Sequence, residues 1–83
     1  MDRVQVYGTE GCADTRAARK NLDRLGVPYR YTNIERDPRA REWVLEQNGG
    51  QQKTPTIQID GQVLVAPDER DLERAVRDTG LMG

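Results

Sequence analysis

The side chain in this sequence best suited to nucleophilic chemistry is Cys12, the only cysteine among 83 residues. It lies in the stretch YGTEGCADTR, between a short apolar run and the expected start of a helix. The N–H groups and partial positive charge of a helix N-terminus stabilise a thiolate and can lower a cysteine pKa from about 8.5 to about 3.5–7.5. Arg16 would add to this effect, whereas Glu10 and Asp14 would oppose it. The position favours a reactive thiol over a small, buried and inert cysteine.

The composition excludes several other chemistries. The sequence has no histidine, which removes His-based metal sites, Cys–His nucleophile pairs and the usual general base near neutral pH. Thirteen Lys and Arg residues and fourteen Asp and Glu residues alternate in sign, with a net charge of −1. That pattern argues against nucleic-acid or membrane partners. A lone thiol is typical of a reducing compartment, so we expect the protein in the cytoplasm.

The elements that must position this thiol can be predicted from periodicity and turn residues. We expect strands over 3–7, 29–34, 56–60 and 62–65, and helices from Ala13 to Gly26, from Asp37 and Pro38 to Asn48, and from Pro67 to Gly80. The three helices would face the core through Ala18, Leu22 and Leu25; through Ala40, Trp43, Val44 and Gln47; and through Leu72, Ala75, Val76 and Thr79. Residues 81–83 would form a frayed tail.

The predicted order is β-α-β-α-β-β-α, in a single α/β domain over residues 1–83. The first two strands would be parallel and the Asp60-Gly61 hairpin would add antiparallel strands, giving a four-stranded mixed sheet with helices on both faces. Cys12 then lies at the carboxyl end of the first strand, an edge where ligand sites of such sheets are found.

The residues resemble the glutaredoxin family, within the thioredoxin-like fold, and most closely its short mycoredoxin-type bacterial members. Four stretches from about Val4 to Val76 carry the resemblance: YGTEGC with the helix ARKNLDRLGVPY, then IERDPRAREWV, NGGQQKTPTI and DGQVLVAPDERDL. No one motif is specific, but the cysteine, the Thr-Pro and the Asp-Gly in this order are informative together.

The resemblance implies that Cys12 is the nucleophile of a thiol-disulfide oxidoreductase, with a low-molecular-weight thiol such as glutathione, mycothiol or bacillithiol as co-substrate. It implies disulfide-bearing protein partners, a monomer and no bound metal. Pro55 would be cis and would face the thiol. The residues that would bind the small thiol or the substrate are Thr9, Gly11, Thr15, Arg16, Lys53, Thr54, Pro55, Pro67 and Asp68. Without the resemblance, the Thr-Pro and Ala-Pro-Asp stretches fit an ordinary strand start and an ordinary capped helix.

The sequence also departs from the family pattern. Thr15 replaces the second cysteine of Cys-x-x-Cys, so only a single-thiol cycle is open, in which a second small thiol regenerates Cys12. Thr9 stands where many glutaredoxins have lysine, which leaves Lys53 or Arg16 to supply positive charge. Val65 and Ala66 replace the usual Gly-Gly before the last helix. These departures weaken the expectation of glutathione as the co-substrate.

Two alternatives stay open at this point. One is a redox-inactive binding module that carries an iron–sulfur cluster between two subunits, with Cys12 and external thiols as ligands. The Cys-Gly-Phe-Ser signature of cluster-binding glutaredoxins is absent from the sequence. The other is an arsenate-reductase-like catalyst that uses Cys12 and Arg16 on an oxyanion. The length of the chain argues against it, because that family has a larger helical insertion.

Overall fold

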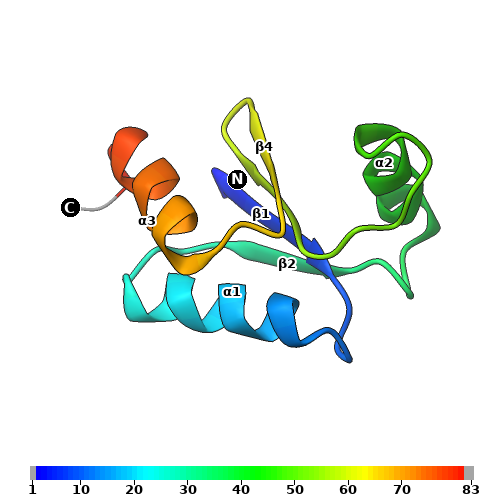
Figure 1. Ribbon diagram of the computed structural model, residues 1–83, viewed down its shortest axis with the longest axis horizontal. Coiled ribbons are helices and arrows are strands. Elements are labelled where there is room, and N and C mark those ends of the chain that lie inside the picture. Colours follow the sequence, from blue (N-terminus) through cyan, green and yellow to red (C-terminus); the bar gives the residue numbers. More distant parts are fainter. Residues whose placement is uncertain (1, 82–83) are drawn as a thin grey trace.

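A computed structural model describes residues 2–81 and confirms the predicted element order (Figure 1). The elements are β1 (Val4–Gly8), α1 (Ala13–Arg24), β2 (Arg30–Asn33), α2 (Pro38–Gln47), β3 (Thr56–Ile59), β4 (Gln62–Val65) and α3 (Glu69–Asp78). Within the described residues, none of the helices is both long and apolar enough to cross a membrane.

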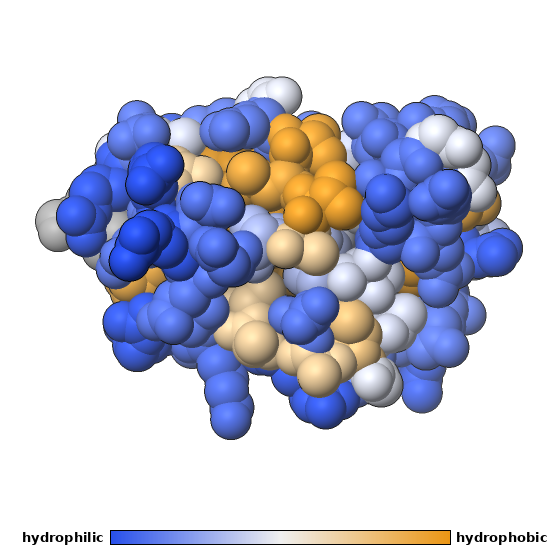
Figure 2. Space-filling model, in the orientation of Figure 1, coloured by the Kyte–Doolittle hydropathy of each residue, from blue (hydrophilic) through white to orange (hydrophobic). Residues whose placement is uncertain are grey.

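The four strands form one mixed sheet in the order β2-β1-β3-β4. β1 pairs in parallel with β2 and antiparallel with β3, and the β3–β4 hairpin completes the sheet. Alternate residues of the two central strands point to one face, where they pack on α1 and α3. This core consists of Val4, Val6, Ala18, Leu22, Val27, Ile57, Ile59, Leu72, Ala75 and Val76. β4 is an edge strand, with Val65 41% exposed, and Figure 2 shows apolar atoms gathered over it.

α2 packs against the opposite face of the sheet. Asp37 caps the helix by accepting a hydrogen bond from the Ala40 N–H, as predicted, and Val44 is buried. The rings of Trp43 and Tyr7 lie 4.7 Å apart, which anchors α2 on β1. The prediction that Gln47 faces inward is wrong, because its side chain is exposed.

Asn48 takes the inward place at the end of α2. Its side-chain amide donates to the Val44 carbonyl (2.8 Å) and to the Thr56 hydroxyl (3.2 Å). Because Asn48 bonds both a carbonyl in the last turn of α2 and a hydroxyl on β3, it fills the inward position, and Gln47 has no packing role there. Ala40 is half-buried rather than a core residue.

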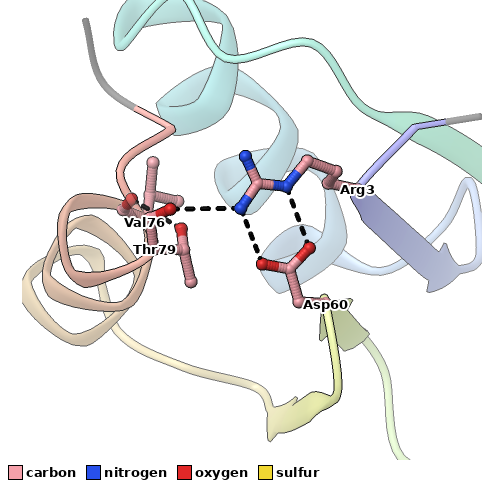
Figure 3. A network of polar contacts seen from close by, with 4 residues as sticks. All are labelled: Arg3, Asp60, Val76 and Thr79. Atoms are coloured by element: carbon pink, nitrogen blue, oxygen red, sulfur yellow. Dashed lines mark hydrogen bonds and ion pairs between the residues drawn. The ribbon is translucent and has the colours of Figure 1, made fainter.

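The C-terminal end of α3 is tied to the sheet by a polar network (Figure 3). The Arg3 guanidinium donates two hydrogen bonds to the Asp60 carboxylate (3.0 and 2.8 Å) and one to the Thr79 carbonyl (3.1 Å). Thr79 is only half-buried, and its hydroxyl donates to the Val76 carbonyl (2.8 Å) instead of joining the core. Arg3 therefore joins the start of β1, the hairpin turn and the end of α3.

The expectation of a frayed tail is wrong for Leu81. Its N–H donates to the Val76 carbonyl (3.2 Å), and its side chain packs against the core. The positive φ of 75° at Gly80 turns the chain back over α3, which brings Leu81 to the core. Residues 82 and 83, the rest of the predicted tail, lie outside the described residues.

Candidate active site

Cys12 is the N-cap residue of α1 and is half-buried. Its N–H donates to the Thr9 carbonyl (3.3 Å), which closes the loop after β1. Its carbonyl accepts from the Arg16 N–H (3.1 Å), the first hydrogen bond of the helix. The sulfur is therefore held at the helix N-terminus, where unpaired N–H groups favour a negative charge.

The Thr54–Pro55 loop faces the sulfur, and its peptide bond is cis, as the resemblance implies. The Cys12 thiol donates to the Thr54 carbonyl at a sulfur–oxygen distance of 3.5 Å. The Pro55 carbonyl in turn accepts from the Ala66 N–H (2.7 Å). Three segments far apart in the sequence thus meet around the thiol: the loop before α1, the proline loop and the segment before α3.

The pKa of the Cys12 thiol is lowered from its ordinary value by these surroundings. Burial raises the pKa, but the polar groups of the Thr15 and Thr54 side chains and of the Thr15 and Asp14 backbone lower it by more. The Thr54 carbonyl acts against them, because it accepts a proton that only the neutral thiol carries. The net effect favours the thiolate, the form that attacks disulfides.

Neither of the two basic residues proposed to support the thiolate contributes to the lowered pKa of Cys12. The Arg16 guanidinium donates to the Glu10 carbonyl (2.9 Å) and is not among the groups that lower the Cys12 pKa. The reason is local, because Glu10 leaves a loop carbonyl within reach of Arg16 on the first turn of α1. Lys53 is exposed. The thiolate is supported by neutral donors rather than by a cation.

A second cluster, missed by the sequence analysis, holds the loop that leads to Cys12. The Arg19 guanidinium lies 3.9 Å above the Tyr31 ring and 3.6 Å from the Glu10 carboxylate, which also accepts from the Tyr31 hydroxyl (3.3 Å). Arg19 further donates to the Tyr29 hydroxyl (3.3 Å). These contacts turn the Glu10 side chain toward β2. Its negative charge is therefore paired there and does not disfavour the Cys12 thiolate. The charge pattern alone could not show which base Glu10 pairs with.

Gly8 and Thr15 touch directly behind the thiol. Thr15 is 1% exposed, although it was predicted only as a binding residue. A Cβ atom at Gly8 would lie 2.5 Å from both Oγ1 and Cγ2 of Thr15. The last residue of β1 must therefore be glycine for α1 to approach the sheet at this point.

A groove of about 400 Å³ runs between α1 and the start of α3. It is lined by Asp14, Ala17, Ala18, Lys20, Asn21, Ala66, Pro67, Asp68 and Glu69. Asp68 is the N-cap of α3, and its carboxylate accepts from the Asp71 N–H (2.8 Å). Glu69 is paired with Arg24 (2.6 Å). Three carboxylates and one ammonium line this groove, so its walls are acidic.

Thr9 and Gly11, also proposed to bind the substrate, lie in the loop that precedes Cys12. Thr9 is half-buried, and its carbonyl accepts a hydrogen bond from the Cys12 N–H. Gly11 is exposed, and nothing lies within 4 Å of the position that a Cβ atom would take there. Pro67 is half-buried on the groove wall. The proposed residues thus gather at one edge of the sheet, with Arg16 turned toward Glu10 and Lys53 in solvent.

Ala66 has a backbone conformation that favours glycine, with φ of 43°. It stands where the family commonly has glycine, so alanine here adopts a left-handed backbone conformation that glycine would adopt without strain. We expect Ala66→Gly to raise the free energy of unfolding by about 1 kcal/mol, because an L-residue in the left-handed region is strained by about 1–2 kcal/mol. Urea denaturation of both proteins measures the change.

Ala17→Gly provides the matched control for Ala66→Gly. Ala17 is exposed within α1, where glycine should lower the free energy of unfolding by about 1 kcal/mol. An Ala66→Gly protein that is no more stable than the original would contradict strain at this residue.

Among residues 2–81, no three His, Cys, Asp or Glu side chains come together in a way that could hold a metal ion. A cluster bound by this protein would therefore need ligands from outside the described chain, as the iron–sulfur alternative assumes.

Comparison with known proteins agrees with this geometry. The family model for glutaredoxin matches residues 4–64. Mycoredoxin 1 of Corynebacterium glutamicum is 35% identical over 57 residues, which cover 69% of this chain and 70% of the relative. A point mutant of the thioredoxin-like protein BC3987 superposes with a TM-score of 0.82 at 25% identity, covering 93% of this chain and 97% of that one.

A buckwheat glutaredoxin–glutathione complex also has the same fold. Its TM-score is 0.73 at 21% identity, and the match covers 99% of this chain and 83% of the plant protein. These neighbours confirm the predicted fold class, a thioredoxin-like α/β fold with a four-stranded mixed sheet.

Proposed function

The chain belongs to the glutaredoxin family of thiol-disulfide oxidoreductases, and on this premise we propose that it reduces mixed disulfides between proteins and a low-molecular-weight thiol. The observation that carries the proposal is the setting of Cys12, the only cysteine, at the N-terminus of α1 and opposite the cis Thr54–Pro55 loop. All of these elements come from one chain, which supports action as a monomer. A thiol that must stay reduced supports a cytoplasmic location.

In the proposed reaction, the Cys12 thiolate attacks the small-thiol sulfur of the mixed disulfide. A disulfide forms between Cys12 and the small thiol, and the protein sulfur leaves as a thiolate that takes a proton from water. The thiolate of a second small thiol then attacks the small-thiol sulfur bound to Cys12. The products are the small-thiol disulfide and the original Cys12 thiolate, so each turnover converts one mixed disulfide and one free small thiol into the protein thiol and one small-thiol disulfide.

The surroundings of Cys12 support this cycle without a general base. A thiolate formed in advance needs no proton acceptor in the attack, so the absence of histidine is no obstacle. The Thr54 backbone, already beside the sulfur, would pair with the bound substrate, and Pro55 would pack against it. Thr9, Gly11, Pro67 and Asp68 would line the path of the small thiol, with Arg16 and Lys53 at its margin.

Among glutathione, mycothiol and bacillithiol, we propose mycothiol as the co-substrate. Glutathione and bacillithiol carry carboxylates, which the Asp14 and Asp68 carboxylates on the groove wall would repel, whereas Glu69 is paired with Arg24. The Asp68 side chain also occupies an N–H of the α3 N-terminus that could otherwise bind a carboxylate. Mycothiol is an uncharged thiol that carries sugar hydroxyl groups, which can donate hydrogen bonds to these carboxylates. A mycoredoxin among the relatives supports the same choice.

The test is a turnover assay with one peptide carrying each of the three small thiols in turn, and with the matching free thiol as reductant. We expect the highest kcat/KM for the mycothiol disulfide. Asp14→Asn should reduce its advantage over the glutathione disulfide by up to about fivefold, because one exposed charge contributes about 1 kcal/mol or less. Faster turnover of the glutathione disulfide would contradict this choice of thiol, while the absence of turnover with all three would contradict the proposed function.

A further inference from the structure

The hydroxyl of Thr15 is the one buried side-chain oxygen or nitrogen within residues 2–81 that has no hydrogen-bond partner. Thr15 itself is only 1% exposed. Leaving a buried polar group unpaired costs about 1–3 kcal/mol, so a valine of the same shape would suit this position better if only packing counted. An unpaired hydroxyl here needs a functional reason.

The position of Thr15 in α1 directs its side chain toward Cys12. Cys12 is the N-cap and Thr15 follows three residues later, a spacing at which side chains meet at the start of a helix. A threonine inside a helix commonly bonds its hydroxyl to a carbonyl one turn earlier, but this hydroxyl has no such bond. Gly8 packs against both Oγ1 and Cγ2, which restricts the rotation of the side chain.

We infer that Thr15 is a positioning residue whose hydroxyl donates a hydrogen bond to the Cys12 thiolate, and this inference rests on the proposed function of Cys12. In the neutral form, the thiol donates to the Thr54 carbonyl, and the Thr15 hydroxyl waits unpaired. When the proton leaves, the Thr15 O–H turns to the sulfur and its buried oxygen gains a partner. The unpaired Thr15 hydroxyl thus destabilises the form with the neutral thiol, and this destabilisation is removed when the thiolate forms.

Thr15 thereby fills a second role at the position of the absent resolving cysteine. A hydroxyl can hold the thiolate but cannot attack a disulfide at Cys12, so the small thiol stays on Cys12 until another small thiol arrives. The same residue would explain how the site keeps a thiolate although Arg16 is bonded to Glu10 and Lys53 lies in solvent.

Three variants test the inference, with the rate of Cys12 alkylation by iodoacetamide followed against pH. Thr15→Val keeps the shape without the hydroxyl and should shift the midpoint to higher pH while leaving the protein at least as stable. Thr15→Ala also lacks the hydroxyl, fits the space beside Gly8 and should show the same shift if the valine variant does not fold. Thr15→Ser keeps the hydroxyl and should keep the midpoint of the wild type, although it loses a buried methyl group.

The outcomes separate this inference from the proposed function. A wild-type midpoint at or above that of an ordinary cysteine would contradict the reactive thiol and the role of Thr15 together. An acidic wild-type thiol whose midpoint is unchanged in the valine and alanine variants would overturn only the role of Thr15. A midpoint that rises in all three variants, serine included, would also overturn it, because packing rather than the hydroxyl would then be responsible.

Discussion

Replacing Cys12 with serine is expected to reduce turnover of mixed disulfides to the rate of the uncatalysed exchange. A serine hydroxyl stays protonated near neutral pH and does not exchange with disulfides, and the chain has no other cysteine to take over. The measurement is the turnover assay with the mycothiol disulfide, run with and without protein. The whole catalytic effect should be lost in this one substitution.

The same variant carries its own control for folding. Cys12 makes no side-chain capping bond at the start of α1, whereas serine is among the preferred N-cap residues. We therefore expect Cys12→Ser to be folded and up to about 1 kcal/mol more stable than the original chain. Turnover above the uncatalysed rate in a folded Cys12→Ser protein would refute Cys12 as the nucleophile.

Gly8→Ala should disturb the active site through Thr15, although Gly8 is not among the residues proposed to bind the substrate. The new Cβ atom would lie 2.5 Å from Oγ1 and Cγ2 of Thr15, which is branched, buried and held in a helix. We expect a loss of about 1–3 kcal/mol in the free energy of unfolding, the usual cost of overpacking a core. Because Thr15 must move, the alkylation midpoint of Cys12 should also rise.

Two variants make this prediction specific. Gly11→Ala adds the same methyl group three residues later, in the loop after β1, but nothing lies within 4 Å of its Cβ, so its stability should change by less than about 0.5 kcal/mol. The double variant Gly8→Ala/Thr15→Ala removes the atoms that clash, so its two effects should not add. Equal stability of Gly8→Ala and Gly11→Ala in urea denaturation would contradict the contact.

The sequence was sufficient to predict the features that depend on local patterns. The strands around Val6 and Ile57, the Asp37 cap and the Asp-Gly hairpin all follow from alternation or from turn residues, and the structure has each of them. The placement of Cys12 at the start of α1 follows from the change of period at Ala13. The cis bond before Pro55 required the family resemblance, since the residues alone fit an ordinary strand start.

The features that could not be predicted depend on which of several equivalent partners a side chain selects. From the sequence, Arg16 could be paired either with the Cys12 thiolate or with a loop carbonyl, and its bond to the Glu10 carbonyl is fixed by the path of the backbone. The contact between Gly8 and Thr15 joins a strand end to a helix, so no periodicity reports it. At Ala66, the local preference of alanine disagrees with the φ that the fold imposes.

The central claim is that Cys12 takes the small thiol from a mixed disulfide and holds it until a second thiol arrives. The most direct test is to mix reduced protein with one equivalent of a peptide–mycothiol disulfide, with no other thiol present, and to measure the masses of the products. The account predicts one mycothiol in disulfide linkage on Cys12 and one equivalent of free peptide thiol. A Cys12 that remains unmodified, or that is linked to the peptide instead, would contradict it.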